Sequence, residues 1–421
     1  MNKNKKLVLK YNESKIDSLI VALSLMSISI SATISVGLGI ENNANVIVLA
    51  LIFVCYFIKI MQTKRLWLDI DYGSMGLLLM ILALFGLSKF FNGNQCNYTF
   101  IQLLFYAILP KLSMDLNFKT NYVLKYSLHL SIITVLAVNG FFEYQYEDMN
   151  QAYMGNIYPI VTMIIIALFH FRFYRHEASK FTWICYLYNV YMTVRVIMVA
   201  NRGALLCIVC AIIVLFLYKF DEEEKIKKNS VKQLIFILVA VIAILFIYYN
   251  QLAIIQNCIS FFGKVFGNVP SFFIKMERYI LLDDVSNGRS TINEVFYEAF
   301  KESPVWGHGM RTFSSYTNNL YPYPHNFIYQ YLFEGGLLFA TIPIFYAVKI
   351  VFDVLLGRIE SKEEYVMAAM LVCQCYPKLL VSTEVWQGTA IWMLITYSYI
   401  CTKKIKKQKG LKQNNKLVRK K

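Results

Sequence analysis

Long uninterrupted apolar runs are the feature that most restricts the fold of this 421-residue chain. Hydrophobic residues make up 57% of it and charged residues only 16%, whereas charged residues are about 25% of an ordinary soluble domain. About 20 apolar residues in a helix cross a hydrocarbon core of roughly 30 Å. The runs therefore predict an all-α polytopic integral membrane protein.

Apolar runs bounded by charged residues predict about twelve transmembrane helices. The expected spans are residues 16–40, 45–60, 72–87, 98–114, 122–142, 154–171, 181–200, 203–218, 231–250, 326–351, 365–381 and 385–401. The first run is too long for a signal peptide and lacks a small-residue cleavage pattern, so we expect it to be a retained span.

The formal net charge of +16 is concentrated in two tails, before the first span and after residue 402. Basic residues gather on the cytoplasmic side of membrane proteins and attract anionic lipid headgroups. We therefore expect both termini to be cytoplasmic, together with the basic connections at 59–65, 111–119, 172–180 and 225–232. No stacking aromatics accompany the basic tail, so nucleic acid is not an expected partner.

One connection, residues 251–325, is far longer than the others and falls on the external side. Loops of this length usually have a function. Thr291 and Glu294 form a capping-box pair, and Ser303-Pro304 ends the helix that follows. We expect this helix to rest an apolar face on the bilayer or on the span ends. That face comprises Ile292, Val295, Phe296, Ala299 and Phe300. A glycine-rich turn is expected at Pro304–Met310.

Two external arginines suggest an anion-binding site. Arg202 lies in a short turn between two spans, where the positive-inside rule disfavours it, and Arg289 precedes the expected helix. A phosphate between a helix N-terminus and these arginines satisfies both, since arginine binds phosphate in bidentate geometry. Arg195, inside a span, is expected to face a cavity or a partner. Salt bridges to Glu143, Asp283 or Asp284 are the alternative.

His325 is the candidate general base. It precedes Asn326, which is suited to cap the next span, and a helix N-terminus favours a neutral imidazole. His308 is a weaker candidate because its glycine-rich turn is expected to be flexible. Glu334 should face the protein interior, because an unpaired carboxylate inside a span is costly. Gly335-Gly336 after it indicates close helix packing.

The nine cysteines form no metal-binding framework. Cys207 and Cys210 lie within an apolar span, where cysteine acts as a small hydrophobic residue. Cys96 and Cys258 fall in external segments, and a disulfide between them is an open alternative.

Three motifs together resemble the O-antigen polymerase and ligase superfamily. They are NRGALL from Asn201, GRST to PVWGHG between Gly288 and Gly309, and HNFIYQYLFEGG from His325. In that family an arginine opens a span, usually as Ser-Arg-Gly. A second arginine precedes a Pro-x-x-Gly-x-Gly pattern in a large external loop, and a His-Asn pair opens the next span. The chain departs from the pattern only in having Asn201 in place of serine.

The resemblance implies a GT-C-like glycosyltransferase that needs neither metal nor cofactor. It implies transfer of oligosaccharide linked to undecaprenyl diphosphate, on the external face of a bacterial inner membrane. Polymerase and ligase share these motifs, and we expect the polymerase, which joins repeat units into surface polysaccharide, O-antigen or capsule. The catalytic residues would be His325, Arg202 and Arg289. The substrate-binding residues would be Arg195, Asn201, Ser290, His308, Arg311, Asn326 and Glu334. A chain-length regulator and a flippase are the expected protein partners.

This assignment divides the chain into a transmembrane bundle (1–200), a catalytic membrane region (201–351), a transmembrane pair (352–402) and a basic tail (403–421). Three alternatives remain open. A ligase would transfer the glycan to a lipid acceptor, and a flippase would translocate lipid-linked sugars. A metal-dependent transferase would use Asp283-Asp284.

Overall fold

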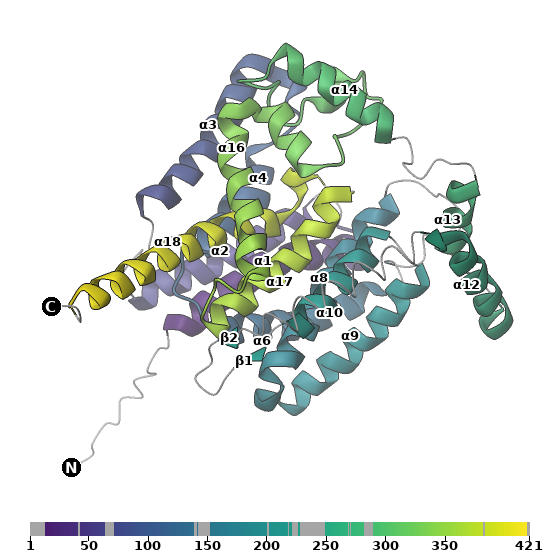
Figure 1. Ribbon diagram of the computed structural model, residues 1–421, viewed down its shortest axis with the longest axis horizontal. Coiled ribbons are helices and arrows are strands. Elements are labelled where there is room, and N and C mark those ends of the chain that lie inside the picture. The colour runs from purple at the N-terminus through teal and green to yellow at the C-terminus, as the bar shows by residue number, and fades with distance from the viewer. Residues whose placement is uncertain are drawn as a thin grey trace.

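The computed structural model is helical (Figure 1). It describes residues 13–40, 43–63, 71–138, 141, 152–199, 202–217, 219–220, 226–227, 249–267, 269, 271–281, 289–381 and 384–418. The only strands among these residues are β1 (Lys219–Phe220) and β2 (Ile226–Lys227), which pair antiparallel. The predicted all-helical class is therefore confirmed for this part of the chain.

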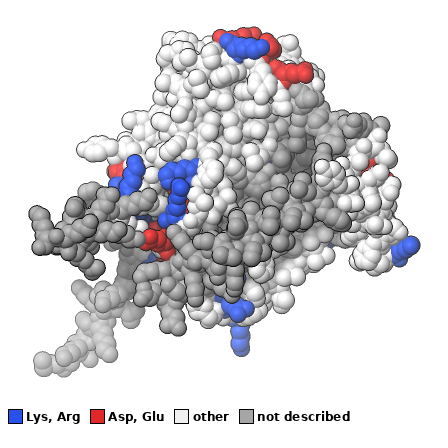
Figure 2. Space-filling view, in the orientation of Figure 1, with Lys and Arg blue, Asp and Glu red and all other residues white. Residues whose placement is uncertain are grey.

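Within the described part of the chain, five helices are long and apolar enough to cross a membrane. They are α1 (Glu13–Leu38), α2 (Ala44–Thr63), α3 (Tyr72–Asn92), α8 (Ala152–Tyr174) and α16 (Phe327–Leu355). Figure 2 shows one face of the molecule on which the described residues are mostly uncharged, with the charged groups gathered towards the edges. Together with the apolar helices, this identifies a multi-pass membrane protein.

Other predicted spans coincide with helices that do not meet the same criteria of length and hydropathy. These are α9 (Lys180–Val199), α10 (Arg202–Leu217), α17 (Lys362–Val381) and α18 (Thr389–Val418). The span predicted at 98–114 consists of α4 (Phe100–Leu103), the π-helical turn η2 (Leu104–Ile108) and α5 (Leu109–Ser113). The span predicted at 122–142 begins as α6 (Thr120–Leu130) and tightens into the 3₁₀ segment η3 (Ser131–Ala137). The span predicted at 231–250 lies almost wholly outside the described residues, so the count of twelve stays a prediction.

Helix α1 is central to the bundle, where it packs on α2, α6 and α8. A second group, α8, α10 and α17, packs mutually beside it. Two of the lysines that enter this core are paired with aspartates. Lys59 Nζ lies 2.7 Å from Asp17 Oδ1, and Lys111 Nζ lies 2.6 Å from Asp115 Oδ2. Pairing is expected, because an uncompensated charge inside a membrane protein is costly.

Four further helices among the described residues belong to the long connection at residues 251–325: α12 (Gln251–Phe266), α13 (Ser271–Leu281), α14 (Arg289–Glu302) and α15 (Phe313–Tyr316). Helices α12 and α13 pack on each other to one side of the bundle (Figure 1). Helix α14 packs on α16, and its expected apolar face is confirmed. Ile292, Phe296 and Ala299 are buried in a cluster with Phe333 of α16. The stripe therefore rests on the start of a span.

The expected capping box at Thr291 is wrong. Helix α14 begins at Arg289, so Thr291 lies inside its first turn. Arg289 accordingly is the first helical residue and does not precede the helix. The predicted end is confirmed, because α14 stops at Glu302, just before Ser303-Pro304.

Helix α16 is broken at Gly336, where the backbone has φ 56° and ψ −166°. The turn at Pro304–Gly309 satisfies the backbone groups that the break exposes. His308 N–H donates to the Phe333 carbonyl at 2.7 Å, and Gly309 N–H donates to the Glu334 carbonyl at 2.9 Å. In return, the N–H groups of Leu337 and Leu338 donate to the carbonyls of Pro304 and Val305. Irregular backbone inside a membrane protein is stable only when such groups are paired.

The expectation that Gly335-Gly336 marks close helix packing is therefore corrected. The backbone that approaches Gly336 belongs to the turn, and a Cβ there would collide with the Val305 carbonyl. The positive φ of Gly336 is also one that residues with a side chain rarely adopt.

Gly336→Ala should therefore destabilise the protein by about 1–3 kcal/mol, from backbone strain and from loss of the turn. The measurement is the thermal unfolding midpoint of the purified protein in detergent. Gly86→Ala on α3 is the matched control, since its new Cβ meets nothing within 4 Å. Equal midpoints for the two variants would contradict the proposed role of the break.

Candidate active site

His325 lies at the mouth of α16, as expected. Asn326 caps the helix, and its side chain accepts a hydrogen bond from Ile328 N–H at 2.9 Å, which confirms the predicted cap. His325 adopts a left-handed conformation with φ 54°, and its ring centroid lies 4.3 Å from that of Tyr323. The imidazole thus lies where the long connection meets the start of α16.

Glu334 faces the protein interior, which confirms the prediction. It is 1% exposed. Its carboxylate accepts hydrogen bonds from Gln330 Nε2 at 2.9 Å, from the Trp386 indole N–H and from the backbone N–H of Arg311. A buried carboxylate with three donors is held in one orientation.

Arg311 is paired with an acid that the sequence analysis did not identify. Its Nε lies 2.6 Å from Oε1 of Glu384, which is buried in the connection between α17 and α18. The guanidinium also lies over the Tyr98 ring, 5.5 Å from its centroid. Next to Glu384, Val385 N–H donates to Gln330 Oε1 at 2.9 Å. Hydrogen bonds and one ion pair therefore connect three segments: the long connection before α16, α16 itself and the α17–α18 connection.

Glu384 and Trp386 were missed because neither stands in a recognisable motif. Gln330 stands in the motif that opens with His325, but nothing in that motif indicates its partner. Only the tertiary fold brings Arg311 together with Gln330, Glu384 and Trp386, because these residues are far apart along the chain. The available signal was the acid itself, Glu384, which stands between two apolar runs.

His308 is not in a flexible turn, which corrects the expectation. Its Nε2–H donates to the Ala299 carbonyl at 2.7 Å, and its ring stacks on Phe333 at 4.7 Å between centroids. The imidazole joins α14 to α16. These contacts make it a positioning residue of the turn, and its expected contact with substrate stays a prediction.

The structure gives the backbone positions of Arg202, Arg289 and Ser290. Arg202 is the first residue of α10, and Arg289 and Ser290 open α14. Asn201 lies outside the described residues. Each arginine therefore stands at a helix N-terminus, where the backbone favours an anion.

Arg195 is half-buried on α9. Its Nη1 donates to the Tyr191 hydroxyl at 2.9 Å. The interaction is within one turn of the same helix, so it leaves the expected role of Arg195 in substrate binding a prediction.

Helix packing places the start of α10 at the same end of the bundle as His325. Cys207 lies against Lys378, and Cys210 Sγ lies 3.9 Å from Cys373 Sγ. The later residue of α10 contacts the earlier residue of α17, so the two helices run antiparallel. The start of α10 therefore lies beside the end of α17. The α17–α18 connection follows directly and binds α16 at Gln330, one to two helical turns after His325.

Alternatives that involve external acids are untested, since Glu143, Asp283 and Asp284 lie outside the described residues. Within the described ranges, no group of three or more His, Cys, Asp and Glu residues is arranged to hold a metal ion. Cys96 and Cys258 are free thiols, so the open alternative of a disulfide between them is not realised.

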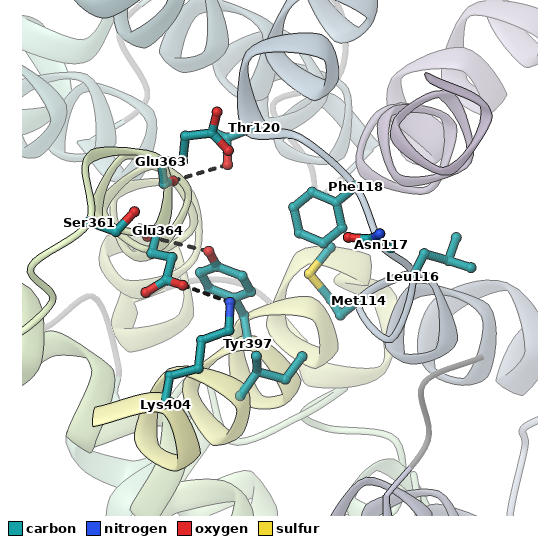
Figure 3. Close-up of a pocket in the computed structure, with 11 residues that line it drawn as sticks. Met114, Leu116, Asn117, Phe118, Thr120, Ser361, Glu363, Glu364, Tyr397 and Lys404 are labelled. Carbon is teal, nitrogen blue, oxygen red and sulfur yellow. Dashed lines mark hydrogen bonds and ion pairs between the residues drawn. The ribbon is translucent and has the colours of Figure 1, made fainter. Parts of the chain in front are cut away.

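A polar cavity of about 180 Å³ lies at the other end of α17 (Figure 3). Its lining includes Thr120, Glu363, Glu364, Tyr397 and Lys404, and Lys404 Nζ lies 2.6 Å from Glu364 Oε1. It lies near the first turn of α17, whereas Glu384 follows the last turn, so about 30 Å of helix separates the cavity from the candidate site.

Burial raises the pKa of Glu384 to about 7, although Arg311 opposes the rise. An unfolded glutamate titrates near 4.3. Between about pH 4.3 and 7 the folded protein therefore binds a proton that the unfolded chain has lost. The contribution of Glu384 to the free energy of unfolding should fall as the pH rises through this range and be constant above it.

Glu384→Gln should remove this part of the pH dependence. Unfolding midpoints measured in detergent from pH 4.5 to 8 test it, with Glu298→Gln as the control at an exposed glutamate on α14. An unchanged slope in Glu384→Gln would show that Glu384 does not titrate in this window.

Comparison with known families gives a match that includes the predicted catalytic residues. Residues 187–342 match the family model Wzy_C, described as O-antigen ligase. A search of curated proteins finds no match. The matched segment begins in α9 and ends just beyond the break in α16, so it holds Arg202, Arg289 and His325. The expected resemblance to the O-antigen polymerase and ligase superfamily is thus confirmed over residues 187–342, which match the O-antigen ligase family model.

Proposed function

We propose that this membrane enzyme polymerises oligosaccharide repeat units carried on undecaprenyl diphosphate. The observation that carries the proposal is the match over residues 187–342, which includes His325 at the mouth of α16 and both arginines at helix N-termini. A bacterial surface polysaccharide, O-antigen or capsule, would be the product.

The leaving group explains the arginines. When the bond between the anomeric carbon and the lipid diphosphate breaks, negative charge develops on the diphosphate. Arg202 and Arg289 bind these oxygens, aided by the N-termini of α10 and α14. Donors that already point at the developing charge stabilise the transition state more than the ground state.

His325 acts on the acceptor. The attacking sugar hydroxyl transfers its proton to the imidazole as its oxygen bonds to the anomeric carbon, and the lipid diphosphate leaves from the opposite face. Direct displacement of this kind inverts the anomeric centre. The charge is managed by guanidinium groups, so the reaction proceeds without a metal ion.

The network around Glu334 and Glu384 supports this assignment because it fixes the base. Arg311 and Gln330 flank the segment that carries His325, and both are tied to the α17–α18 connection. A general base has to be held within hydrogen-bond reach of the proton that it accepts.

A ligase is the second candidate, favoured by the description of the matching family as O-antigen ligase. The chemistry at the diphosphate is the same, and the acceptor becomes a lipid A core in place of a second lipid-linked repeat unit. Among the residues implicated here, only those near the acceptor would distinguish the two.

The basic tails support a cytoplasmic position for both termini in a bacterial inner membrane, with the transfer site on the external face. A flippase would then deliver the donor to that face, and a chain-length regulator would end polymerisation.

Alanine at Arg202, Arg289 or His325 should lower polymer formation at least about 100-fold, because each removes transition-state stabilisation or the general base. The measurement is the ladder of polymer lengths formed from lipid-linked repeat units in proteoliposomes. Arg278→Ala on the exposed side of α13 and His176→Ala on the exposed 3₁₀ turn after α8 are matched controls.

Full-length ladders from the three variants would contradict the proposal. Loss of lipid translocation with unchanged polymer would identify a flippase, and transfer to a lipid A core without a ladder would identify a ligase.

Chelation provides a separate test of the mechanism. Polymer formation should be unchanged in excess EDTA, because cationic side chains neutralise the leaving group. Activity that is lost in EDTA and restored by Mg²⁺ or Mn²⁺ would point to metal chemistry at Asp283-Asp284 instead.

A further inference from the structure

Lys378 is an exception among the buried lysines of the described chain. Three lysines are buried: Lys59, Lys111 and Lys378. The first two each contact an aspartate, at 2.7 Å and 2.6 Å. Lys378 is 6% exposed, and no ion pair among the described residues includes it. Its ammonium lies over the face of Tyr158, 5.7 Å from the ring centroid.

The surroundings of Lys378 offer little other compensation. It lies in the last turn of α17, where α17 packs against α8 and α10. Its backbone N–H donates to the sulfur of Cys207 on α10, and Tyr158 belongs to α8. An aromatic face stabilises a cation less than a carboxylate pair does when both are buried.

This lysine lies near the start of α10, the helix that begins with Arg202. Cys207 follows Arg202 by five residues, so Lys378 lies about 7.5 Å along α10 from the start of that helix. A helix N-terminus carries partial positive charge. A buried lysine, an arginine and a helix N-terminus thus gather at one end of the bundle, and a bound anion would stabilise all three.

We propose that Lys378 binds the diphosphate of the lipid-linked donor, as a third cation beside Arg202 and Arg289. This inference rests on the proposed function. A diphosphate suits the position because it carries more than one negative charge on a membrane-anchored lipid. A phospholipid headgroup at the bundle surface is the less suitable ligand, because Lys378 is enclosed by three helices.

The experiment compares thermal unfolding of the full-length protein in detergent, with and without undecaprenyl diphosphate, for wild type, Lys378→Met and Lys378→Arg. Without ligand, Lys378→Met should unfold at the wild-type temperature or higher, because the substitution removes an unpaired buried charge. The affinity derived from the ligand-induced shift should fall at least about tenfold in Lys378→Met and be largely kept in Lys378→Arg.

Lys111→Met is the matched control. It leaves Asp115 buried without its cation, so it should lower the unfolding temperature without ligand and keep the ligand-induced shift. In the polymerisation assay, Lys378→Met should raise KM for the donor more than it lowers kcat, which a purely structural lysine would not do.

Parallel titrations with inorganic pyrophosphate and with phosphatidylglycerol identify the source of the phosphate. The inference is supported if undecaprenyl diphosphate gives the largest Lys378-dependent shift. It is overturned if only phosphatidylglycerol gives one, or if Lys378→Met keeps the wild-type shift with all three ligands.

Arg202→Ala separates the inference from the proposed function. If Arg202→Ala loses the shift and Lys378→Met keeps it, only the role of Lys378 fails. If neither variant changes the shift, diphosphate recognition at this end of the bundle fails as well.

Discussion

The exchange of backbone hydrogen bonds between the Pro304–Gly309 turn and the break in α16 is the interaction on which the site depends. A helix that opens inside a membrane protein exposes carbonyl and N–H groups, and lipid offers them no partner. Here a segment of the long connection before α16 supplies those partners, at both sides of Gly336. The position of the turn relative to the span is therefore set by the backbone itself, and the side chains of His308 and Arg311 follow from it.

The second tie is electrostatic. Arg311 continues the chain from the turn and is held by Glu384, while Glu334 accepts the Arg311 backbone N–H and the Trp386 indole N–H. Two carboxylates and one guanidinium in a buried setting favour retention of one proton. The pKa of Glu384, raised to about 7 by burial, is consistent with this balance. The last two helices of the chain thus take part in a site whose family match ends at residue 342.

Local sequence patterns predicted the features whose cause is local. Apolar runs located most of the helices, because the length of a span is fixed by the bilayer. Asn326 was predicted as a cap and Ile292 to Phe300 as a buried stripe, since both depend on helical spacing. The start of α14 was misplaced because capping preferences are weak beside tertiary packing. The break at Gly336 and the Arg311–Glu384 pair depend on contacts between distant segments, and neither composition nor spacing reports those. The sequence could propose His325 as the base, but it could not say which residues position it.

Anchoring at both ends has a consequence for residues 312–326, the excursion that carries Tyr323 and His325. Its entry is fixed by Arg311 and its exit by the capped start of α16 and Gln330. The position of the two ends of this segment therefore does not depend on the residues in its middle. Substitutions or changes of length in the middle of residues 312–326 would alter what this segment contacts outside the membrane. The two ends of the segment, and with them the positions of the site residues, would stay in place.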